Sequence, residues 1–327
     1  MGALTETALD LDPVAETEHL TARLRDSLRH LGRRGAVIGV SGGVDSAVCA
    51  TLAVRAIGAE RVFCLMMPER DSSDASLMRG LQLVTALGAP HAVKEITSTL
   101  QAIGAYDERD EAVRSVFPDY TRDWKWKIAI GGGLEGRYNS FDLIALRPGS
   151  STPERRRLDA TSFFRIVAAT NYKQRIRKSI EYFHADRLHY AVIGTPNRLE
   201  YDQGFFVKLG DGAADIKPIA HLYKSQVYAL ARHLGVPPAI LNAAPTTDTY
   251  SLPQGQDEFY FALTFAEMDR ALWARNHDVS AEELARELGI DTGRAERIYA
   301  DIEAKRRATR YLHLPPLLAG PIDEVGA

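Results

Sequence analysis

The sequence has few of the features that mark secreted, membrane or metal-binding proteins. Its 327 residues include two cysteines, Cys49 and Cys64. Both fall at apolar positions of a predicted helix and a predicted strand, so we expect buried thiols and not a disulfide, a zinc site or a nucleophile. No apolar run approaches the roughly 20 residues that cross a bilayer, and the acidic start, Met1–His19, lacks the basic and apolar regions of a signal peptide. We therefore expect a cytoplasmic protein with no membrane partner.

A strong excess of one charge is also missing. The formal net charge is −3, which argues against a nucleic-acid partner. The basic clusters Trp124-Lys-Trp-Lys and Arg155-Arg-Arg could still suggest one, but isolated basic groups are usually solvated surface. With 45% hydrophobic and 25% charged residues, the composition is typical of a soluble enzyme. We predict a single domain over residues 1–327.

Apolar, β-rich runs alternate with segments of helical periodicity. Strands are predicted at Val37–Val40, Val62–Met67, Ala92–Ile96 and Tyr190–Ile193, and helices at Glu18–Leu31, Ser72–Leu87, Phe163–Ala185 and Leu222–Leu234. The first part of this order reads βαβαβ. It predicts an α/β fold with a parallel sheet flanked by helices, and a ligand at the carboxyl ends of the strands.

Two regions depart from this alternation. Periodicity breaks between residues 98 and 161, which we interpret as an insertion with short strands at Ile128–Ile130 and Phe141–Leu146. Residues 256–311 form a helical C-terminal region, with helices predicted at Glu258–Arg275, Ser280–Leu288 and Arg294–Tyr311. Between the two parts, the Thr-, Pro- and Gly-rich segment Ala243–Gly255 predicts a loop that closes over a bound nucleotide.

One stretch, Ala36 to Val48, joins a buried strand to a helix through a loop of the size of a phosphate group. Ser41, Gly42 and Gly43 carry no large side chain, so backbone N–H groups of the loop and of the helix that follows can face an anion. A Walker loop would have a lysine, but here an acid, Asp45, stands in its place. An acid repels phosphate unless a divalent cation lies between them, so the loop predicts a magnesium-bound phosphate. The alternative is that Asp45 and Ser46 only cap a helix.

The loop resembles the signature of the ATP pyrophosphatases, which adenylate a substrate and hold the leaving pyrophosphate at such a loop. Longer motifs narrow the resemblance to the ammonia-dependent NAD synthetases. Those enzymes have Gly-Thr, a glutamate five positions on, and then Gly-Phe/Tyr-Phe-Thr-Lys-Tyr-Gly-Asp-Gly-Gly-Ala-Asp. The corresponding segments here are Gly194-Thr195-Pro-Asn-Arg-Leu-Glu200 and Gly204-Phe-Phe-Val-Lys208-Leu-Gly-Asp211-Gly-Ala-Ala-Asp215. Further matches are Pro68-Glu-Arg-Asp-Ser-Ser, Asn171-Tyr-Lys-Gln-Arg175-Ile-Arg177, Leu222-Tyr-Lys224-Ser-Gln-Val-Tyr and Pro245-Thr246-Thr-Asp248.

This resemblance implies a Rossmann-like fold of the ATP pyrophosphatase type and a homodimer. It also implies a reaction, in which ATP activates nicotinic acid adenine dinucleotide as an acyl-adenylate and ammonia converts that intermediate to NAD, AMP and pyrophosphate. By the resemblance, Asp45, Lys224 and Asp211 are catalytic, and Asp45 and Glu200 hold Mg²⁺. The ATP site would comprise Gly39, Val40, Ser41, Gly42, Gly43, Val44, Asp45, Ser46, Thr195, Lys224 and Thr246. The dinucleotide would bind Arg175, Lys208, Asp215 and Lys305.

Simpler interpretations of these residues stay open. Glu200 could be a surface acid, and Lys208 and Lys224 could be solvated. Asp211 and Asp215 could be turn residues that bond their own backbone. The segments Pro196-Asn-Arg-Leu and Tyr201-Asp-Gln203 also depart from the family pattern near the expected acid pocket. One rival hypothesis is therefore a paralogue that amidates another carboxylic acid. A tRNA-modifying pyrophosphatase and a catalytically silent binding protein are the others.

Overall fold

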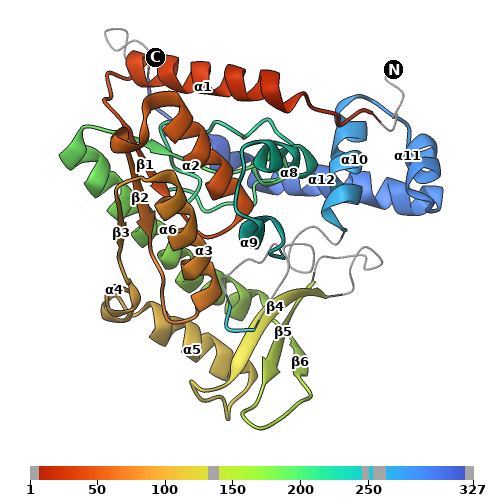
Figure 1. Cartoon of the computed structure of the whole chain (residues 1–327). Helices are drawn as coiled ribbons and strands as arrows, with labels where there is room; N and C mark the ends of the chain where they lie inside the picture. Colours follow the sequence, from red (N-terminus) through yellow and green to blue (C-terminus); the bar gives the residue numbers. More distant parts are fainter. Residues whose placement is uncertain (1–6, 132–139, 245–249, 253–262, 321–327) are drawn as a thin grey trace.

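The computed structural model describes residues 7–131, 140–244, 250–252 and 263–320. Its centre is a four-stranded parallel sheet in the order β3-β2-β1-β7, with helices on both faces (Figure 1). The strands are β1 (Ala36–Gly39), β2 (Val62–Met66), β3 (His91–Val93) and β7 (Ala191–Ile193). The parallel sheet that the alternation predicts is confirmed, although β3 is shorter than its predicted range.

Alternating side chains of the strands build two separate cores. Ile38 of β1 belongs to the core formed with α1 (Pro13–His30), α2 (Val44–Ile57), α3 (Asp74–Leu87) and α8 (Lys224–His233). The next residue along the strand, Val37, faces the opposite core, which includes side chains of α4 (Thr97–Ala102), α5 (Ala105–Val116) and α6 (Ala160–Leu188). Successive side chains of a strand point to opposite faces, so a shift of one residue would exchange the side chains that face the two cores. The alternation therefore fixes the register of the sheet. Cys49 and Cys64 are free and buried in the first core, as predicted.

The region between β3 and α6 contains more regular structure than the sequence predicts. After α4 and α5 it forms an antiparallel sheet of β4 (Lys125–Gly131), β5 (Ser140–Leu146) and β6 (Glu154–Arg157). The two predicted short strands correspond to β4 and β5. The helix α5 escapes prediction because charged residues, Arg109 and Asp110, occupy two of its buried positions. The strand β6 escapes because it consists of charged residues on an edge.

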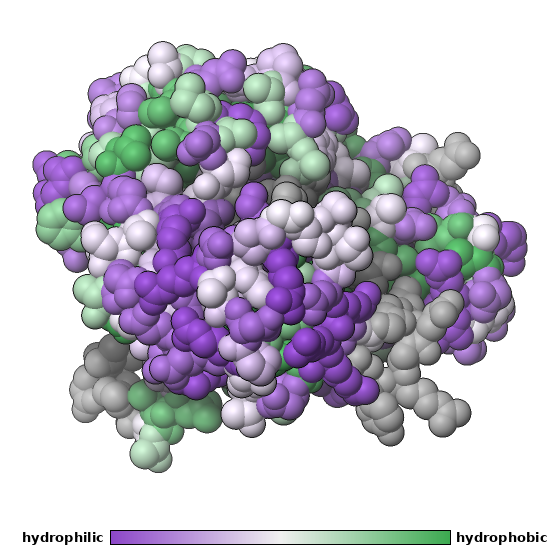
Figure 2. Space-filling model, turned by 90° about the horizontal axis from the view of Figure 1, so that it is seen from below, coloured by the Kyte–Doolittle hydropathy of each residue, from purple (hydrophilic) through white to green (hydrophobic). Residues whose placement is uncertain are grey.

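The outer face of this region is hydrophilic, and two arginines of its basic triplet have hydrogen-bond partners. Figure 2 shows hydrophilic residues across much of the molecule seen from below, the side on which α5 and the β4–β6 sheet lie in Figure 1. In the basic triplet, Arg155 bonds to Asp142 at 2.5 Å and Arg156 donates to the carbonyl of Val116 at 2.7 Å. The Asp142 carboxylate offsets part of the positive charge of the cluster, which supports its interpretation as solvated surface.

The C-terminal helices form a third core beside α7 (Arg198–Gln203). They are α10 (Phe265–Asn276), α11 (Ala281–Leu288) and α12 (Thr292–His313), in agreement with the predicted helices from Phe265 on. Residues 258–262 of the first predicted helix lie outside the described residues. The remaining short elements are η1 (Ala59–Arg61) and α9 (Pro238–Leu241). Within the described residues, no helix combines the length and the apolarity that crossing a membrane requires.

Candidate active site

The phosphate-sized loop follows β1 and leads directly into α2. Gly42 has φ +81°, and a Cβ atom on it would lie 2.2 Å from the carbonyl oxygen of Ser76 on α3. The loop therefore requires glycine there, both for its left-handed backbone and for its contact with α3. The N-cap of α2, Gly43, supplies no side-chain hydrogen bond to the first turn. The positive end of α2 is thus left for a ligand, which agrees with the predicted anion site.

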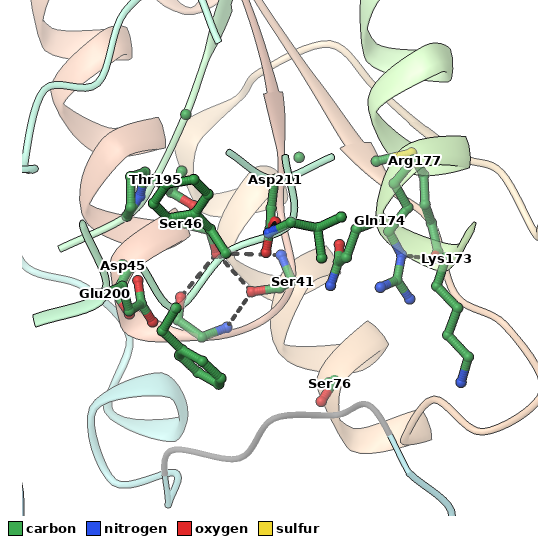
Figure 3. A pocket seen from close by; sticks show the side chains of 18 of the residues that line it. Ser41, Asp45, Ser46, Ser76, Lys173, Gln174, Arg177, Thr195, Glu200 and Asp211 are labelled. Carbon is green, nitrogen blue, oxygen red and sulfur yellow. Dashed lines mark hydrogen bonds between the residues drawn. The ribbon is translucent and has the colours of Figure 1, made fainter. Parts of the chain in front are cut away.

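Two serines hold the loop in this shape. Ser46, which is 3% exposed, donates from Oγ to the carbonyl of Gly43 at 3.0 Å and accepts from the N–H of Ser41 at 3.2 Å. Its Oγ also lies 3.2 Å from Oγ of Ser41 (Figure 3). Ser41 Oγ accepts in turn from the N–H of Gly43 at 3.3 Å. The hydroxyls of both residues are therefore engaged in bracing the loop in this structure.

Asp45 on α2 forms an ion pair with Lys224, the first residue of α8. Its other carboxylate oxygen accepts from Nδ2 of Asn197 at 3.2 Å. Burial by itself lowers the pKa of Lys224, but the negative charges of Asp45 and Glu200 outweigh burial and the pKa lies above its ordinary value. The Lys224 ammonium is therefore charged at neutral pH, and it is only 2% exposed.

Glu200 lies on α7, next to Asp45 in Figure 3. It accepts from the N–H of Asn197 at 3.2 Å, and the Asn197 side chain accepts from the N–H of Glu200, so the two residues form a capping box. This contact fixes Glu200 from behind while it lines the same cavity as Asp45. Glu200 is therefore a half-buried acid of the cavity wall, and its role as a metal ligand stays a prediction.

A cavity of about 610 Å³ opens at the carboxyl ends of β1, β2 and β7. It brings together most of the residues that the sequence motifs select: Gly39, Val40, Ser41, Gly42, Gly43, Val44, Asp45, Ser46, Arg175, Thr195, Glu200, Lys208, Asp211 and Lys224. Figure 3 shows Asp45, Glu200 and Thr195 on one side of it and Lys173 and Arg177 on the other. The cavity thus has an acidic side at the phosphate loop and a basic wall on α6.

The comparisons with known proteins agree with this geometry. The family model described as NAD synthase matches residues 16–117 and 144–310. The chain belongs to the NAD synthase family. It is 53% identical over 319 residues to the NH(3)-dependent NAD(+) synthetase of Rhizobium meliloti, an alignment that covers 97% of this chain and 95% of the relative. The corresponding protein of Thermotoga maritima is 37% identical over 81% of this chain and 89% of its own length.

Solved structures show that the fold is that of the family. The chain resembles the NH3-dependent NAD synthetase of Campylobacter jejuni with a TM-score of 0.63 and 24% identity, covering 95% of this chain and 100% of that one. The NMN synthetase of Francisella tularensis gives a TM-score of 0.64 with 24% identity, over 94% and 99% of the two chains. The predicted Rossmann-like fold and the predicted family are both confirmed.

Lys208 and Asp211 come from the segment after α7. Nζ of Lys208 donates to the carbonyls of Tyr311 and Leu314, at 2.8 and 3.1 Å, and so fastens this segment to the end of α12. Asp211 accepts from the N–H of Val207 at 2.6 Å, which is a turn-bracing contact. Both residues line the cavity.

Two of the selected residues lie away from the cavity, and a third is outside the described residues. Asp215 accepts from the N–H of Val192 at 2.7 Å and from the Tyr182 hydroxyl at 3.3 Å, so it braces the end of β7. Lys305 is 8% exposed on α12 and pairs with Asp301 at 2.6 Å. The structure does not bring these two side chains to the cavity. Thr246, and most of the loop predicted to close over the nucleotide, lie outside the described residues.

A buried charge network beside the α6 wall was not predicted. Lys173 donates to Glu69 at 2.8 Å and to Asp71 at 3.0 Å, and Arg109 bonds to the same Asp71 oxygen at 2.6 Å. Glu69 also accepts from the Tyr106 hydroxyl at 2.7 Å. The network ties the segment after β2 to α5 and α6. Its members lie in motifs that match the family or in α5. The sequence gives no signal of their pairing, which spans 37 positions for Tyr106 and Glu69 and 104 for Lys173 and Glu69.

Proposed function

We propose that the protein is an ammonia-dependent NAD synthetase. A carboxylate oxygen of nicotinic acid adenine dinucleotide attacks the α-phosphorus of ATP, the bond to the pyrophosphate oxygen breaks, and the electron pair leaves with pyrophosphate. Ammonia then attacks the acyl-adenylate carbonyl and AMP departs, which forms the amide. The observation that carries this proposal is the uncapped start of α2, with Asp45 and Lys224, across one cavity from the basic wall of α6.

The residues of the phosphate side fit this chemistry. The N–H groups at the start of α2 favour the pyrophosphate end of ATP, and the buried Lys224 ammonium offsets charge that develops on the leaving group. Thr195 lines the same side, after β7. Thr246 stays a proposed ATP ligand on the strength of the motif alone.

Magnesium fits the donor set on this side. Asp45 and Glu200 both line the cavity, and Mg²⁺ is commonly held by one or two carboxylates together with substrate phosphates. We propose these two residues as its ligands. When bound, Mg²⁺ would neutralise phosphate charge next to two acids that otherwise repel it. The Lys224 ammonium, already paired with Asp45, adds to that neutralisation.

We propose that the α6 wall receives the acid substrate. A dinucleotide carries two phosphates and a carboxylate, and guanidinium groups bind such anions by paired, charge-assisted hydrogen bonds. Arg175 donates to the carbonyl of Lys208 at 3.3 Å and Arg177 to that of Met67 at 3.1 Å, so both side chains are held but not neutralised by these partners. Arg175 and Lys208 are the proposed ligands of the dinucleotide. Asp215 and Lys305 do not line the cavity, so we do not propose that they contact the dinucleotide directly.

We also propose a homodimer that works in the cytoplasm. Large apolar side chains on α6 are exposed, with Phe164 at 66%, Phe183 at 62% and Tyr172 at 40%. A second copy of the chain would cover them. A molecular mass measured by light scattering tests the dimer, and a monomer at micromolar concentration would contradict it.

We keep residues 98–161 as a proposed insertion that forms part of the cavity wall on the side of the acid substrate. Phe141 of β5 stacks on Phe163 with ring centroids 4.2 Å apart, and both residues line the cavity.

Free ammonia is the proposed nitrogen source. A glutaminase needs an exposed, activated nucleophile, whereas Cys49 and Cys64 are both buried. Burial raises the pKa of Cys64 to about 12, and burial together with the charges of Asp45 and Glu200 raises that of Cys49 well above its usual value. Steady turnover of the purified protein with glutamine as the sole nitrogen source would contradict this part of the proposal.

The deciding assay supplies ATP, Mg²⁺ and ammonium with one acid at a time. The acids are nicotinic acid adenine dinucleotide, the corresponding mononucleotide and a panel of simple carboxylic acids, and the products are separated to detect AMP, pyrophosphate and the amide. We expect AMP and NAD with the dinucleotide. AMP formation with a simple acid but not with the dinucleotide would replace the proposal with the amidating paralogue, and ADP in place of AMP would contradict both.

A further inference from the structure

One arginine on the phosphate side of the cavity has no role in the motifs above. Arg79 lies on α3 and lines the cavity together with Ser41, Gly42 and Gly43. Its Nε donates to the carbonyl of Gly42 at 3.1 Å, and its Nη2 donates to Oγ of Ser76 at 3.0 Å. Both partners are neutral, and no acid within the described ranges forms an ion pair with Arg79. Its positive charge is therefore still available to a ligand.

Three lysines that line the cavity are in a different state, whereas Nζ of a fourth, Lys208, bonds to backbone carbonyls as described above. Lys224 pairs with Asp45, Lys178 pairs with Glu181 at 2.6 Å, and Lys173 bonds to two buried acids. The guanidiniums of Arg175 and Arg177, which bond to carbonyls, belong to the opposite wall on α6. On the side of the phosphate loop, Arg79 is thus a cation that the described residues do not neutralise.

Arg79 is also built into the loop that would hold the phosphates. The loop and α3 are in contact at Gly42, where a Cβ atom would lie 2.2 Å from the Ser76 carbonyl oxygen. Because the peptide group is planar, the hydrogen bond from Arg79 to the Gly42 carbonyl also fixes the direction of the Gly43 N–H. The guanidinium is consequently held at a fixed place relative to the start of α2.

We propose that Arg79 is a catalytic residue that binds the leaving pyrophosphate. It would supply from α3 the positive charge that a Walker loop supplies with its own lysine, while Nε and Nη2 keep the loop in shape. This inference rests on the proposed function, in which the bond between the α-phosphorus and the bridging oxygen breaks and the electron pair passes to pyrophosphate. A guanidinium with N–H groups left over suits that ligand, since it bonds phosphate oxygens in pairs.

Inorganic pyrophosphate with Mg²⁺ is the probe, titrated calorimetrically into four variants. Arg79→Met removes the charge, and Arg79→Lys keeps the charge but cannot bridge Gly42 and Ser76. Ser76→Ala removes only the hydrogen bond between Arg79 and the Ser76 hydroxyl. Arg55→Met is the control and changes an exposed arginine at the end of α2. We expect Arg79→Met to weaken pyrophosphate binding by about tenfold or more, as for loss of one charge-assisted contact. Arg79→Lys should keep part of the affinity, and the other two variants should lie within about threefold of the wild type.

Kinetics of AMP formation supply the second readout. The kcat of Arg79→Met should fall by about 10²- to 10³-fold, as for removal of one preorganised donor, with little change in the KM of the acid substrate. If Arg79→Met folds and binds pyrophosphate as tightly as the wild type, the inference is overturned. Equal losses of pyrophosphate affinity in Arg79→Met and Arg79→Lys would also overturn it, because they would indicate that Arg79 only braces the loop. If Arg79→Met does not fold, the comparison of Arg79→Lys with Ser76→Ala decides. The pyrophosphate titration needs no acid substrate, so its outcome is separate from failure of the proposed function.

Discussion

Lys224 and Asp45 meet in an ion pair although 179 positions separate them in the sequence. The pair joins the start of α8 to the start of α2, which places an ammonium group beside Asp45 in the lining of the cavity. Lys224 is 2% exposed, and its backbone N–H donates to the buried carboxylate of Asp269 at 3.1 Å. The cation is therefore held rigidly by both its side chain and its backbone.

Replacing this lysine tests whether its charge serves the reaction. Lys224→Met keeps the apolar stem and removes the ammonium, so we expect kcat for AMP formation to fall by about 10²- to 10³-fold. The measurement is AMP release at saturating ATP, with circular dichroism to confirm folding. Lys94→Met, at an exposed position after β3, is the matched control. A fall of less than threefold in Lys224→Met would assign Lys224 to structure alone.

Much of the phosphate side could be predicted from the sequence because its residues are local. Ser41 to Ser46 form one turn between a strand and a helix, and the hydrogen bonds among Ser41, Gly43 and Ser46 that shape it lie within five positions. Pairings across the chain could not be predicted this way. The positions of Asp215 behind β7 and of Lys173 between two acids depend on how α6 packs, and a motif fixes residue types but not the direction of their side chains.

The same difference between local and long-range features decides how much of the fold could be predicted from the sequence. Strands that are apolar on both faces, such as β1, are evident from composition. The helix α5 hides its periodicity because Arg109 and Asp110, the latter 0% exposed, replace apolar residues in its buried face. Only the partners in space, Asp71 and Arg122, explain why such residues are tolerated there.

Glu200 offers a direct test of the magnesium proposal. Glu200→Gln keeps a carbonyl oxygen that can accept from the N–H of Asn197, so the capping box and the stability of α7 should survive. The loss of a charged ligand should raise the Mg²⁺ concentration for half-maximal activity by about tenfold or more. The measurement is AMP formation across a magnesium titration at fixed free ATP. An unchanged titration midpoint in Glu200→Gln would remove Glu200 from the metal site.

The two glycines of the phosphate loop should differ in their tolerance of alanine. Gly42→Ala places a Cβ 2.2 Å from a backbone oxygen at φ +81°. The crowding should cost about 1–3 kcal/mol and the left-handed backbone about 1–2 kcal/mol more. Gly43→Ala has φ −94° and meets only Oγ of Ser41 at 3.4 Å, so it should cost less than about 1 kcal/mol. Urea unfolding measures both free energies, and equal losses would contradict the close contact between the loop and α3.

The last prediction concerns the pH dependence of stability that the buried charge network produces. Burial alone would raise the pKa of Asp71, but the positive charges of Lys173 and Arg109 outweigh it, and the pKa lies below its ordinary value. In the unfolded chain an aspartate titrates near about 3.9. Because the folded pKa is the lower one, the stabilisation is complete above the unfolded value and is lost as pH falls through the folded value.

Asp71→Asn should therefore lower the melting temperature most at neutral pH, where it leaves Lys173 and Arg109 without a shared partner. Breaking an isolated buried pair costs about 3–5 kcal/mol, and we expect a smaller loss here because Lys173 keeps Glu69 and Arg109 keeps Asp110 as partners. The difference from the wild type should begin to narrow below about pH 4, where Asp71 of the unfolded wild-type chain becomes protonated, and should close as pH falls through the lower pKa of the folded state. Thermal melts from pH 7 to pH 3 measure it, with Asp26→Asn, an exposed acid on α1 paired with Arg29, as the control. A difference between Asp71→Asn and wild type that stays constant down to pH 3 would show that the carboxylate charge of Asp71 does not stabilise the fold.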